Sequence, residues 1–579
     1  MVINDKMHLK FSFLSRFTAL ALLAGPSIAM AFSQGTLKRN LKLAAELGID
    51  PNSILRGGKS VHALVQATNG ISVTPEYVEL PIDHNDDSIG RYKNRYWVSS
   101  EYYQEGGPVF VYDVGEASAE ISAKTHLTND TSFFAELLST FGGMGIVWEH
   151  RYYGDSLPFP VSTETPPEHF AYLTTKQALA DIPSFAKNFT RSEYAHIDLT
   201  PTGTPWVMVG GSYAGIRAAF TRNEYPETIF ASFASSAPVE ARVDMSIYFD
   251  QVHDGMVANG HGNCTKDIKA ALEYIDGELA KNATAKASIK QAFFGPGAEK
   301  NSDGDFTAAL AGVYGYFQSY GLGGGDGSLE NLCNHMETDP MTLTVAGPRG
   351  FAPYRGRKFA AEQFSSWPIF KKLVNVNYDT NCGQLDDTLP LSCVLNPKSV
   401  EPDTISWAWQ FCTEWGFYQS NNFGPHSLLS RYQTLDYQQY TCNRQFPEGL
   451  KKGLVPKSPL VDVTNNMTGG WSIRPSNVYW SGGQFDPWRT LSPLATQKDA
   501  PQVALTTKIP KCNMGTDPET LFGYIMPNAE HCFDFQTDFD PGKVSRQHFY
   551  EALKEWLPCF KGQGSGVGSG NSSRIHGHS

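Results

Sequence analysis

The chain has 579 residues, of which 41% are hydrophobic, 12% aromatic and 18% charged. This composition excludes a natively unfolded protein, and the length suits either several domains or one enzyme core with a large insertion. The formal net charge is −12 and no run of lysine or arginine occurs, which excludes a nucleic-acid-binding surface.

The N-terminal segment, residues 1–31, has the pattern of a secretory signal peptide. Three basic residues precede a short apolar stretch, and small residues surround a cleavage site after Ala31. The alternative is a short membrane anchor, which Gly25 and Pro26 disfavour. No later stretch has eighteen uninterrupted apolar residues, so we expect no contact with a membrane after signal cleavage.

Two features agree with export. Sequons of the form N-x-S/T predict glycosylation in a eukaryotic secretory pathway, at Asn129, Asn188, Asn263, Asn282, Asn466 and Asn571. We therefore expect a secreted, extracellular protein, with the vacuole or lysosome as the alternative destination.

The nine cysteines are the second feature. They contain no C-x-x-C pair, so disulfides are favoured over a metal site. Cys382 with Cys393 would close a short loop, and Cys512 with Cys532 would clamp the segment around His531. One thiol must remain unpaired.

Between residues 105 and 240, short apolar runs alternate with helical patterns. Strands are expected at 108–112, 145–148, 206–209 and 229–233, and a helix at 133–141 that ends at Gly142-Gly143. Continuous apolar strands in β-α-β order predict a parallel sheet covered by helices.

The pattern changes after residue 244. Apolar residues at helical spacing between 268 and 279, and a glycine-rich loop at 321–327, predict a mainly helical insertion over 245–470. The strand pattern resumes at 477–480, and a closing helix is expected after Ser545. We therefore predict a core at 32–244, the insertion at 245–470, a second core part at 471–560 and a disordered Gly/Ser-rich tail at 561–579.

The segment around Ser212 has the pattern of a nucleophile elbow. An apolar strand leads through Gly210-Gly211 to Ser212, and a helix follows from Tyr213. Glycines beside the serine allow a strained turn, which projects the hydroxyl from the end of the strand. A structural Gly-Ser turn is the alternative, but the flanking strand and helix favour a nucleophile.

A serine nucleophile needs a histidine to accept its proton and a carboxylate to orient that histidine. Asp486 follows the strand at 477–480, and His531 lies 45 residues later, before the closing helix. The order Ser, Asp, His is that of an α/β-hydrolase. We therefore expect Ser212, Asp486 and His531 to be catalytic.

The chain resembles the serine carboxypeptidase S28 family, which cleaves at proline and includes lysosomal Pro-X carboxypeptidase, dipeptidyl peptidase II and fungal prolyl peptidases. The matching stretches are W-E-H-R-Y-Y-G-D-S-L-P-F at 148–159, G-G-S-Y at 210–213, W-Q-F-C-T-E at 409–414, D-P-W at 486–488, and His531. Ala214 departs from the family, whose members usually have glycine there.

The resemblance implies an α/β-hydrolase fold with a large, mainly helical cap insertion. It also implies a role for each predicted catalytic residue: Ser212 as nucleophile, His531 as base and then acid, and Asp486 as its orienting partner. The oxyanion would be bound by the backbone N–H of Tyr213 and by the backbone at Gly115 and Glu116.

A proline-binding pocket needs flat aromatic walls, because the proline ring is rigid and apolar. Trp407 and Trp409 are candidates, with helix core as the alternative for each. Glu116 or Glu149 could bind a substrate amine and Arg151 a carboxylate, although a structural ion network is favoured for all three.

These observations predict a secreted serine peptidase that cleaves proline-containing peptides at Pro-X bonds, with no metal and no organic cofactor. The alternatives are a secreted esterase or lipase with the same triad, and a catalytically inactive binding protein on the same fold.

Overall fold

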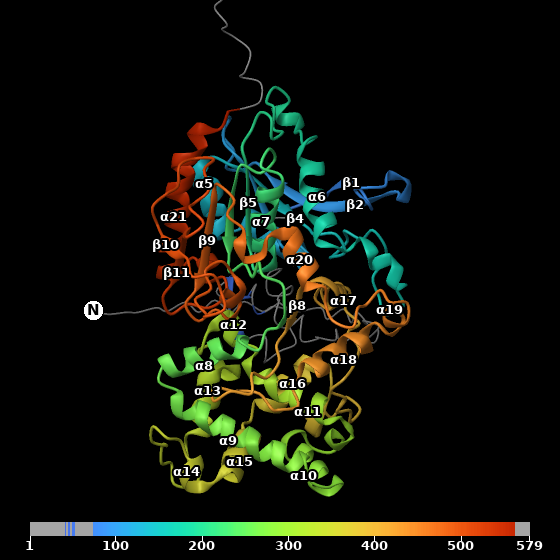
Figure 1. Cartoon of the computed structure of the whole chain (residues 1–579), viewed down its shortest axis with the longest axis vertical. Coiled ribbons are helices and arrows are strands. Elements are labelled where there is room, and N and C mark those ends of the chain that lie inside the picture. Colours follow the sequence, from blue (N-terminus) through green and yellow to red (C-terminus); the bar gives the residue numbers. More distant parts are fainter. Residues whose placement is uncertain (1–40, 42–43, 47–48, 53–72, 562–579) are drawn as a thin grey trace, which may run out of the picture.

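A mixed β-sheet lies at the centre of the upper half of the molecule in Figure 1. In the residues that the structure describes, which are 41, 44–46, 49–52 and 73–561, this sheet has nine strands in the order β1-β2-β4-β3-β5-β6-β9-β11-β10. The β1–β2 and β2–β4 pairs are antiparallel and the other pairs are parallel. The strands are Glu76–Pro81 (β1), Arg91–Ser99 (β2), Val109–Asp113 (β3), Met144–Trp148 (β4), Trp206–Gly211 (β5), Ala231–Ser235 (β6), Val478–Gly483 (β9), Ala504–Thr506 (β10) and Thr520–Met526 (β11).

The structure is a computed structural model of the chain. The predicted signal peptide, and the predicted tail apart from Lys561, lie outside the described residues. The four strands expected between 105 and 240 are present as β3 to β6, within two residues of the expected positions. Sequence patterns missed β1, β2, β10 and β11.

Helices cover both faces of the sheet, which explains why its central strands are apolar throughout. On one face Phe110 and Tyr112 of β3 pack with residues of α5 and α21, and on the other Val109 and Val111 pack with α6. The core helices are Glu120–Thr128 (α4), Phe133–Phe141 (α5), Thr175–Ala186 (α6), Tyr213–Glu224 (α7) and Asp540–Trp556 (α21).

The ends of two helices can be compared with the positions predicted from the sequence. Helix α5 ends at Gly142, whose φ of 58° lies in the left-handed region that glycine adopts without strain, as expected. Helix α21 begins at Asp540, five residues before Ser545. The prediction placed its start too late because Pro541 reads as a helix breaker, yet proline is well tolerated in the first turn.

The chain between β6 and β9 forms the lower half of Figure 1 and part of the junction with the core. We call residues 245–470 the cap region. Its helices are Tyr248–Ala258 (α8), Gly262–Leu279 (α9), Ala283–Phe294 (α10), Asp303–Leu310 (α11), Phe317–Tyr320 (α12), Leu329–Met336 (α13), Ala352–Arg355 (α14), Arg357–Ser366 (α15), Phe370–Tyr378 (α16), Pro402–Gln410 (α17), Leu435–Gln445 (α18), Pro447–Lys451 (α19) and Val461–Thr468 (α20). A short strand that sequence analysis missed, Gly416–Tyr418 (β8), pairs in parallel with Arg242–Asp244 (β7).

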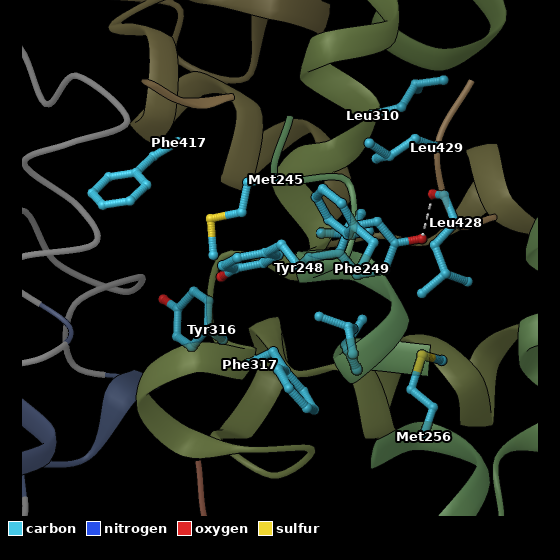
Figure 2. Packing of buried hydrophobic residues seen from close by; sticks show 14 of the residues in the cluster. Met245, Tyr248, Phe249, Met256, Leu310, Tyr316, Phe317, Phe417, Leu428 and Leu429 are labelled. Atoms are coloured by element: carbon cyan, nitrogen blue, oxygen red, sulfur yellow. Dashed lines mark hydrogen bonds between the residues drawn. The ribbon is translucent and has the colours of Figure 1, made fainter. Parts of the chain in front are cut away.

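Aromatic and aliphatic side chains hold the cap region together. Figure 2 shows Tyr248 and Phe249 of α8 at the centre of this cluster, with Phe317 below them and Leu428 and Leu429 to one side. The Phe249 ring lies 5.4 Å from that of Tyr314, whose hydroxyl donates a hydrogen bond to the Leu428 carbonyl. The loop that follows β8 is thereby fixed to α8.

Four disulfides account for eight of the nine cysteines: Cys264–Cys333, Cys382–Cys393, Cys412–Cys442 and Cys512–Cys559. The short Cys382–Cys393 loop is confirmed. The pairing of Cys512 with Cys532 is wrong, because Cys532 is buried beside the end of β5 as a free thiol, and Cys559, just after α21, takes its place.

Among the described residues, the helices are all too short or too polar to cross a bilayer.

Candidate active site

Ser212 occupies a strained turn between β5 and α7. Its φ of 66° and ψ of −130° are unusual for a residue with a side chain. The serine is 9% exposed and lines a cavity of about 510 Å³ between the core and the cap region. This is the conformation expected of a nucleophile elbow.

Two glycines make the turn possible. A Cβ at Gly210 would lie 2.2 Å from the Ala214 carbonyl oxygen, and one at Gly215 would lie 2.7 Å from the Ser235 carbonyl oxygen. Both contacts are too close for any side chain. The close approach on the helix side therefore falls on Gly215, which explains why Ala214 fits in place of the family's glycine.

The side chains of His531 and Asp486 contact each other. The Nδ1 of His531 lies 2.9 Å from Oδ1 of Asp486, and both side chains are buried. Asp486 follows β9 and also accepts a hydrogen bond from the backbone N–H of Trp488. The other ring nitrogen of His531, Nε2, has no hydrogen-bond partner among the described residues. It is therefore available to a hydroxyl.

The cap region helps to hold this pair. The backbone N–H of His531 donates to the backbone carbonyl of Gln318, on α12. The Gln318 side-chain oxygen accepts from Trp488 Nε1 at 2.9 Å and from the Tyr248 hydroxyl at 3.2 Å. Gln318 thus connects the segments that carry Asp486 and His531. Sequence analysis missed it because it lies 168 residues before Asp486 and belongs to no motif.

Burial and the Asp486 charge have opposite effects on His531. Burial is the largest single effect and disfavours the imidazolium, but Asp486 and the neighbouring Cys532 side chain together outweigh burial and raise the pKa of His531 above its ordinary value. The neighbouring Glu530 is 5% exposed; its burial, and then the charge of Asp486, raise its pKa to about 8. The carboxyl of Glu530 is therefore neutral over the range in which a histidine usually titrates.

The backbone N–H groups predicted to bind an oxyanion differ in whether they already have a hydrogen-bond partner. Tyr213 is the first residue of α7, where a backbone N–H has no partner within the helix. The N–H of Gly115 instead donates to Oδ1 of Asp113 at 2.9 Å, so its assignment as an oxyanion donor is wrong. Gly115 adopts φ 75° in that turn, beside Ala214. The Glu116 N–H stays a prediction.

The side chain of Tyr213 belongs to a buried hydrogen-bond relay. Its hydroxyl accepts from Gln410 Nε2 at 2.7 Å and lies 3.2 Å from His150 Nε2, while the Gln410 oxygen accepts from the Tyr153 hydroxyl. Burial, together with the charge of Arg217, lowers the pKa of His150 well below its ordinary value. A neutral His150 with Nδ1–H toward the Arg151 carbonyl can accept from Tyr213. The relay joins the 148–159 stretch, the elbow and α17.

The cavity beside Ser212 has aromatic walls from both halves of the molecule. Trp407 lines it, and its ring lies 5.5 Å from that of Tyr213; its role in binding substrate stays a prediction. Trp409 points elsewhere and stacks on Phe170 at 5.0 Å, so its assignment to the pocket is wrong. The two tryptophans are two positions apart on α17, and this separation places them on opposite faces of a helix. Other aromatic residues of the lining are Tyr248, Phe249, Phe411, Phe417, Tyr418 and Trp488.

Glu149 and Arg151 are structural, and the assignment of Glu149 to the pocket is wrong. Glu149 is fully buried, pairs with Arg95 and accepts from the backbone of Ala119 and Ser156. Arg151 forms a two-point ion pair with Asp181. Glu116, by contrast, lines the cavity, and its Oε2 has no hydrogen-bond partner among the described residues.

The predicted glycosylation sites differ in accessibility. Asn188, Asn282 and Asn466 are exposed and Asn129 is half-buried, whereas Asn571 lies outside the described residues. Asn263 lies on α9, where its Nδ2, the atom that would carry a glycan, donates to Glu337 at 2.8 Å. A glycan at Asn263 would replace one of the two hydrogens on this nitrogen, beside the carboxylate of Glu337.

The strand order, with its antiparallel first strands, and the strand–turn–helix at Ser212 define an α/β-hydrolase fold. Within that class, the family model for serine carboxypeptidase S28 matches residues 81–511. The chain belongs to this family.

Curated relatives agree with this assignment. A protein of Arthroderma benhamiae named "Probable extracellular serine carboxypeptidase" is 27% identical over 89% of this chain and 72% of its own. The human thymus-specific serine protease is 27% identical over 81% of this chain and 83% of its own. The lysosomal Pro-X carboxypeptidase of Bos taurus is 23% identical over 84% and 88%. These relatives support a serine-type peptidase.

Solved structures give a weaker likeness. An esterase of Pyrobaculum calidifontis is 10% identical with a TM-score of 0.29, covering 91% of this chain and 94% of that chain. A proline iminopeptidase of Mycobacterium smegmatis is 10% identical with a TM-score of 0.27, covering 82% and 100%. The fold class rests instead on the order of the strands.

Proposed function

We propose that this chain is a secreted serine peptidase that hydrolyses peptides at Pro-X bonds through an acyl-enzyme on Ser212. The observation that carries the proposal is the hydrogen bond between His531 and Asp486, with Nε2 of the same histidine unpartnered and Ser212 on an elbow at the cavity. Support for peptide as the substrate class comes from the family.

The chemistry follows from these positions. Nε2 of His531 takes the proton of Ser212 as Oγ bonds to the carbonyl carbon, and the N–H of Tyr213 stabilises the resulting oxyanion. The imidazolium, stabilised by Asp486, then gives the proton to the leaving amine as the peptide C–N bond breaks. Water, losing a proton to the same nitrogen, hydrolyses the ester and restores Ser212.

Aromatic walls support selection of proline. Trp407 and its neighbours offer flat apolar surfaces, which suit a rigid ring that has no N–H to satisfy. The named activity of the bovine relative, Pro-X carboxypeptidase, supports the same choice.

The cavity offers a charge for either end of a peptide. Glu116 would attract a free amine, and Lys398, which also lines the cavity, would attract a free carboxylate. Glu116→Gln should raise KM for peptides with a free N-terminus, whereas Lys398→Met should raise KM for peptides with a free C-terminus.

The test compares the mature enzyme with Ser212→Ala and with Ser192→Ala, an exposed serine on the core. Proline peptides with free or blocked termini are digested and the products are identified by mass spectrometry; a short acyl ester is assayed in parallel. We expect the wild-type enzyme and Ser192→Ala to cleave after proline and to be labelled by a fluorophosphonate. Ser212→Ala should do neither. Hydrolysis of the ester with no cleavage of any peptide would establish the esterase, and an unlabelled wild-type enzyme would indicate the inactive binding protein.

A further inference from the structure

A cluster of metal-binding side chains lies on the cap region, apart from the residues that line the cavity. His253 and Asp254 are on α8, and His426 is in the loop after β8, about 170 residues away in the chain. One ligand atom of each lies within 4.8 Å of those of the other two. The imidazole rings of His253 and His426 are stacked in parallel, with 4.2 Å between their centroids. Two nitrogen donors and one carboxylate oxygen therefore lie close together at one place on the cap region.

The two segments that carry these side chains pack on the hydrophobic cluster of the cap region. On α8, Phe249 and Met256 face the cap cluster, as Figure 2 shows, whereas Asp254 lies at the surface. His426 is two residues before Leu428, whose side chain enters the same cluster. The two ligand-bearing segments are thus joined by the packed core of the cap region, which fixes their separation.

Hydrogen bonds also fix the loop that carries His426. Asn421 Nδ2 donates to the Leu429 carbonyl, and the Ser427 N–H donates to the Gly424 carbonyl. Lys269 Nζ lies 3.3 and 3.1 Å from the carbonyl oxygens of Gly424 and Pro425, so this cation is bound to the loop backbone. A loop held at several points loses little entropy when one of its side chains binds an ion.

The charges around the cluster favour a cation. Asp250, one turn before Asp254 on α8, is hydrogen-bonded by the Asn422 side chain, which again links α8 to the loop. Asp250 interacts electrostatically with Asp254, His253 and His426. Two imidazoles with two carboxylates nearby are a donor set that suits zinc and related divalent transition ions.

We propose that His253, Asp254 and His426 bind one divalent transition-metal ion of the zinc type. Ligand atoms around a tetrahedral zinc ion are about 3.4 Å apart. Nδ1 of His253 and Oδ1 of Asp254 are already 3.4 Å apart, and His426 is exposed, so its ring can rotate out of the stack on His253 and turn a nitrogen toward them. Water completes the coordination, as in other sites with three protein ligands.

The position of the cluster suggests what the ion does. It joins α8 to the loop after β8, and the first turn of α8 contributes Tyr248 and Phe249 to the cavity. Tyr248 also contacts Trp488, two residues after Asp486. The bound ion therefore cross-links α8 and the loop after β8 and stabilises one wall of the cavity. It takes no part in peptide hydrolysis.

The proposal is tested on the untagged mature enzyme with ZnCl₂ as the probe. Isothermal titration should show one site, and thermal unfolding should shift to higher temperature as zinc is added. Binding should weaken as the pH falls through the ordinary histidine range, because protons compete for the ligands. His426→Ala and His253→Ala should each weaken zinc binding at least about tenfold.

His196→Ala is the matched control. His196 is an exposed histidine that pairs with Glu105 on the core, and its loss should leave the zinc affinity unchanged. Circular dichroism and hydrolysis of the standard peptide without zinc show whether each variant folds. Equal zinc affinity in wild type and His426→Ala, or no binding to the folded wild type, would overturn the proposal.

Discussion

The hydroxyl of Tyr213 and the side-chain amide of Gln410 form a buried hydrogen bond of 2.7 Å, and this bond joins the residue after Ser212 to α17 of the cap region. Gln410 also accepts from Tyr153. Because the predicted oxyanion donor is the N–H of Tyr213, Gln410 acts as a positioning residue for that donor.

Gln410→Leu should therefore lower kcat more than it changes KM. The loss of one hydrogen bond, worth about 1 kcal/mol, corresponds to a decrease in kcat of about fivefold. Tyr213→Phe, which removes the other partner, should add little to the effect of Gln410→Leu. Steady-state kinetics of the two single variants and the double variant give this comparison. Additive effects would show that the hydrogen bond is not the link.

Asp486→Asn should abolish most of the activity without unfolding the enzyme. The asparagine keeps the shape but no longer stabilises the imidazolium, and the analogous change in a serine protease lowers kcat by about 10⁴-fold. The variant is compared with wild type by kcat and by melting temperature. A variant with near-normal kcat would exclude Asp486 from the triad.

The pH dependence of kcat/KM follows from the sign of the His531 shift. The base must be neutral to accept the serine proton, and the Asp486 carboxylate favours the protonated form. Activity should therefore be lost as the pH falls through a value above the ordinary histidine pKa of about 6.5. In Asp486→Asn the residual activity should be lost at a lower pH than in wild type. If the pH at which activity is lost were the same in both proteins, the acidic side of the profile would report a group other than His531.

Glu530 should make the protein less stable as the pH rises. Burial and then the Asp486 charge raise its pKa from 4.5 to about 8 in the folded state. Between these values the unfolded chain has released a proton that the folded chain retains, so the free energy of unfolding decreases by at most about 1.4 kcal/mol per pH unit. The stabilisation is complete below the lower value and lost above the higher one.

Glu530→Gln, which stays neutral, should flatten this dependence. Urea unfolding of both proteins at several pH values across the window measures it. Parallel curves for wild type and variant would show that Glu530 does not titrate in this window.

Cys532 should be the single free thiol. It is 1% exposed, so a thiol reagent should not label the native protein but should label one cysteine after denaturation without reductant. Peptide mapping should place the label on Cys532, and Cys532→Ser should lose it. Labelling of Cys512 or Cys559 instead would contradict the observed pairing.

The sequence predicted the sheet and the elbow because both leave local signals. Four buried strands appear as apolar runs, and Gly210 and Gly215 are required within a few residues of Ser212. Asp486 could be placed because it follows a predicted strand, and His531 because it precedes the predicted closing helix in the known order Ser, Asp, His. β10 was missed because it has only three residues and none of them is buried, so it lacks the buried apolar run by which the central strands were recognised.

The errors at the candidate site concern side-chain contacts that sequence patterns did not reveal. Gly115 was assigned to the oxyanion, but the Asp113 side chain two residues earlier captures its N–H. Trp409 and Trp407 look alike in sequence, and the helix turns one toward the cavity and the other toward Phe170. Gln318 reaches His531 only because the cap region packs on the core, which depends on the whole fold.

The positions of the disulfides have a consequence for access to Ser212. Three of them lie wholly within the cap region, and Cys512–Cys559 lies wholly within the core. The two halves are each cross-linked internally, yet no sulfur bridge crosses the junction that the structure describes. Hydrogen bonds such as those of Gln318 and Gln410, together with apolar packing, hold that junction, so separating the two halves to admit a peptide would require no reduction of a disulfide.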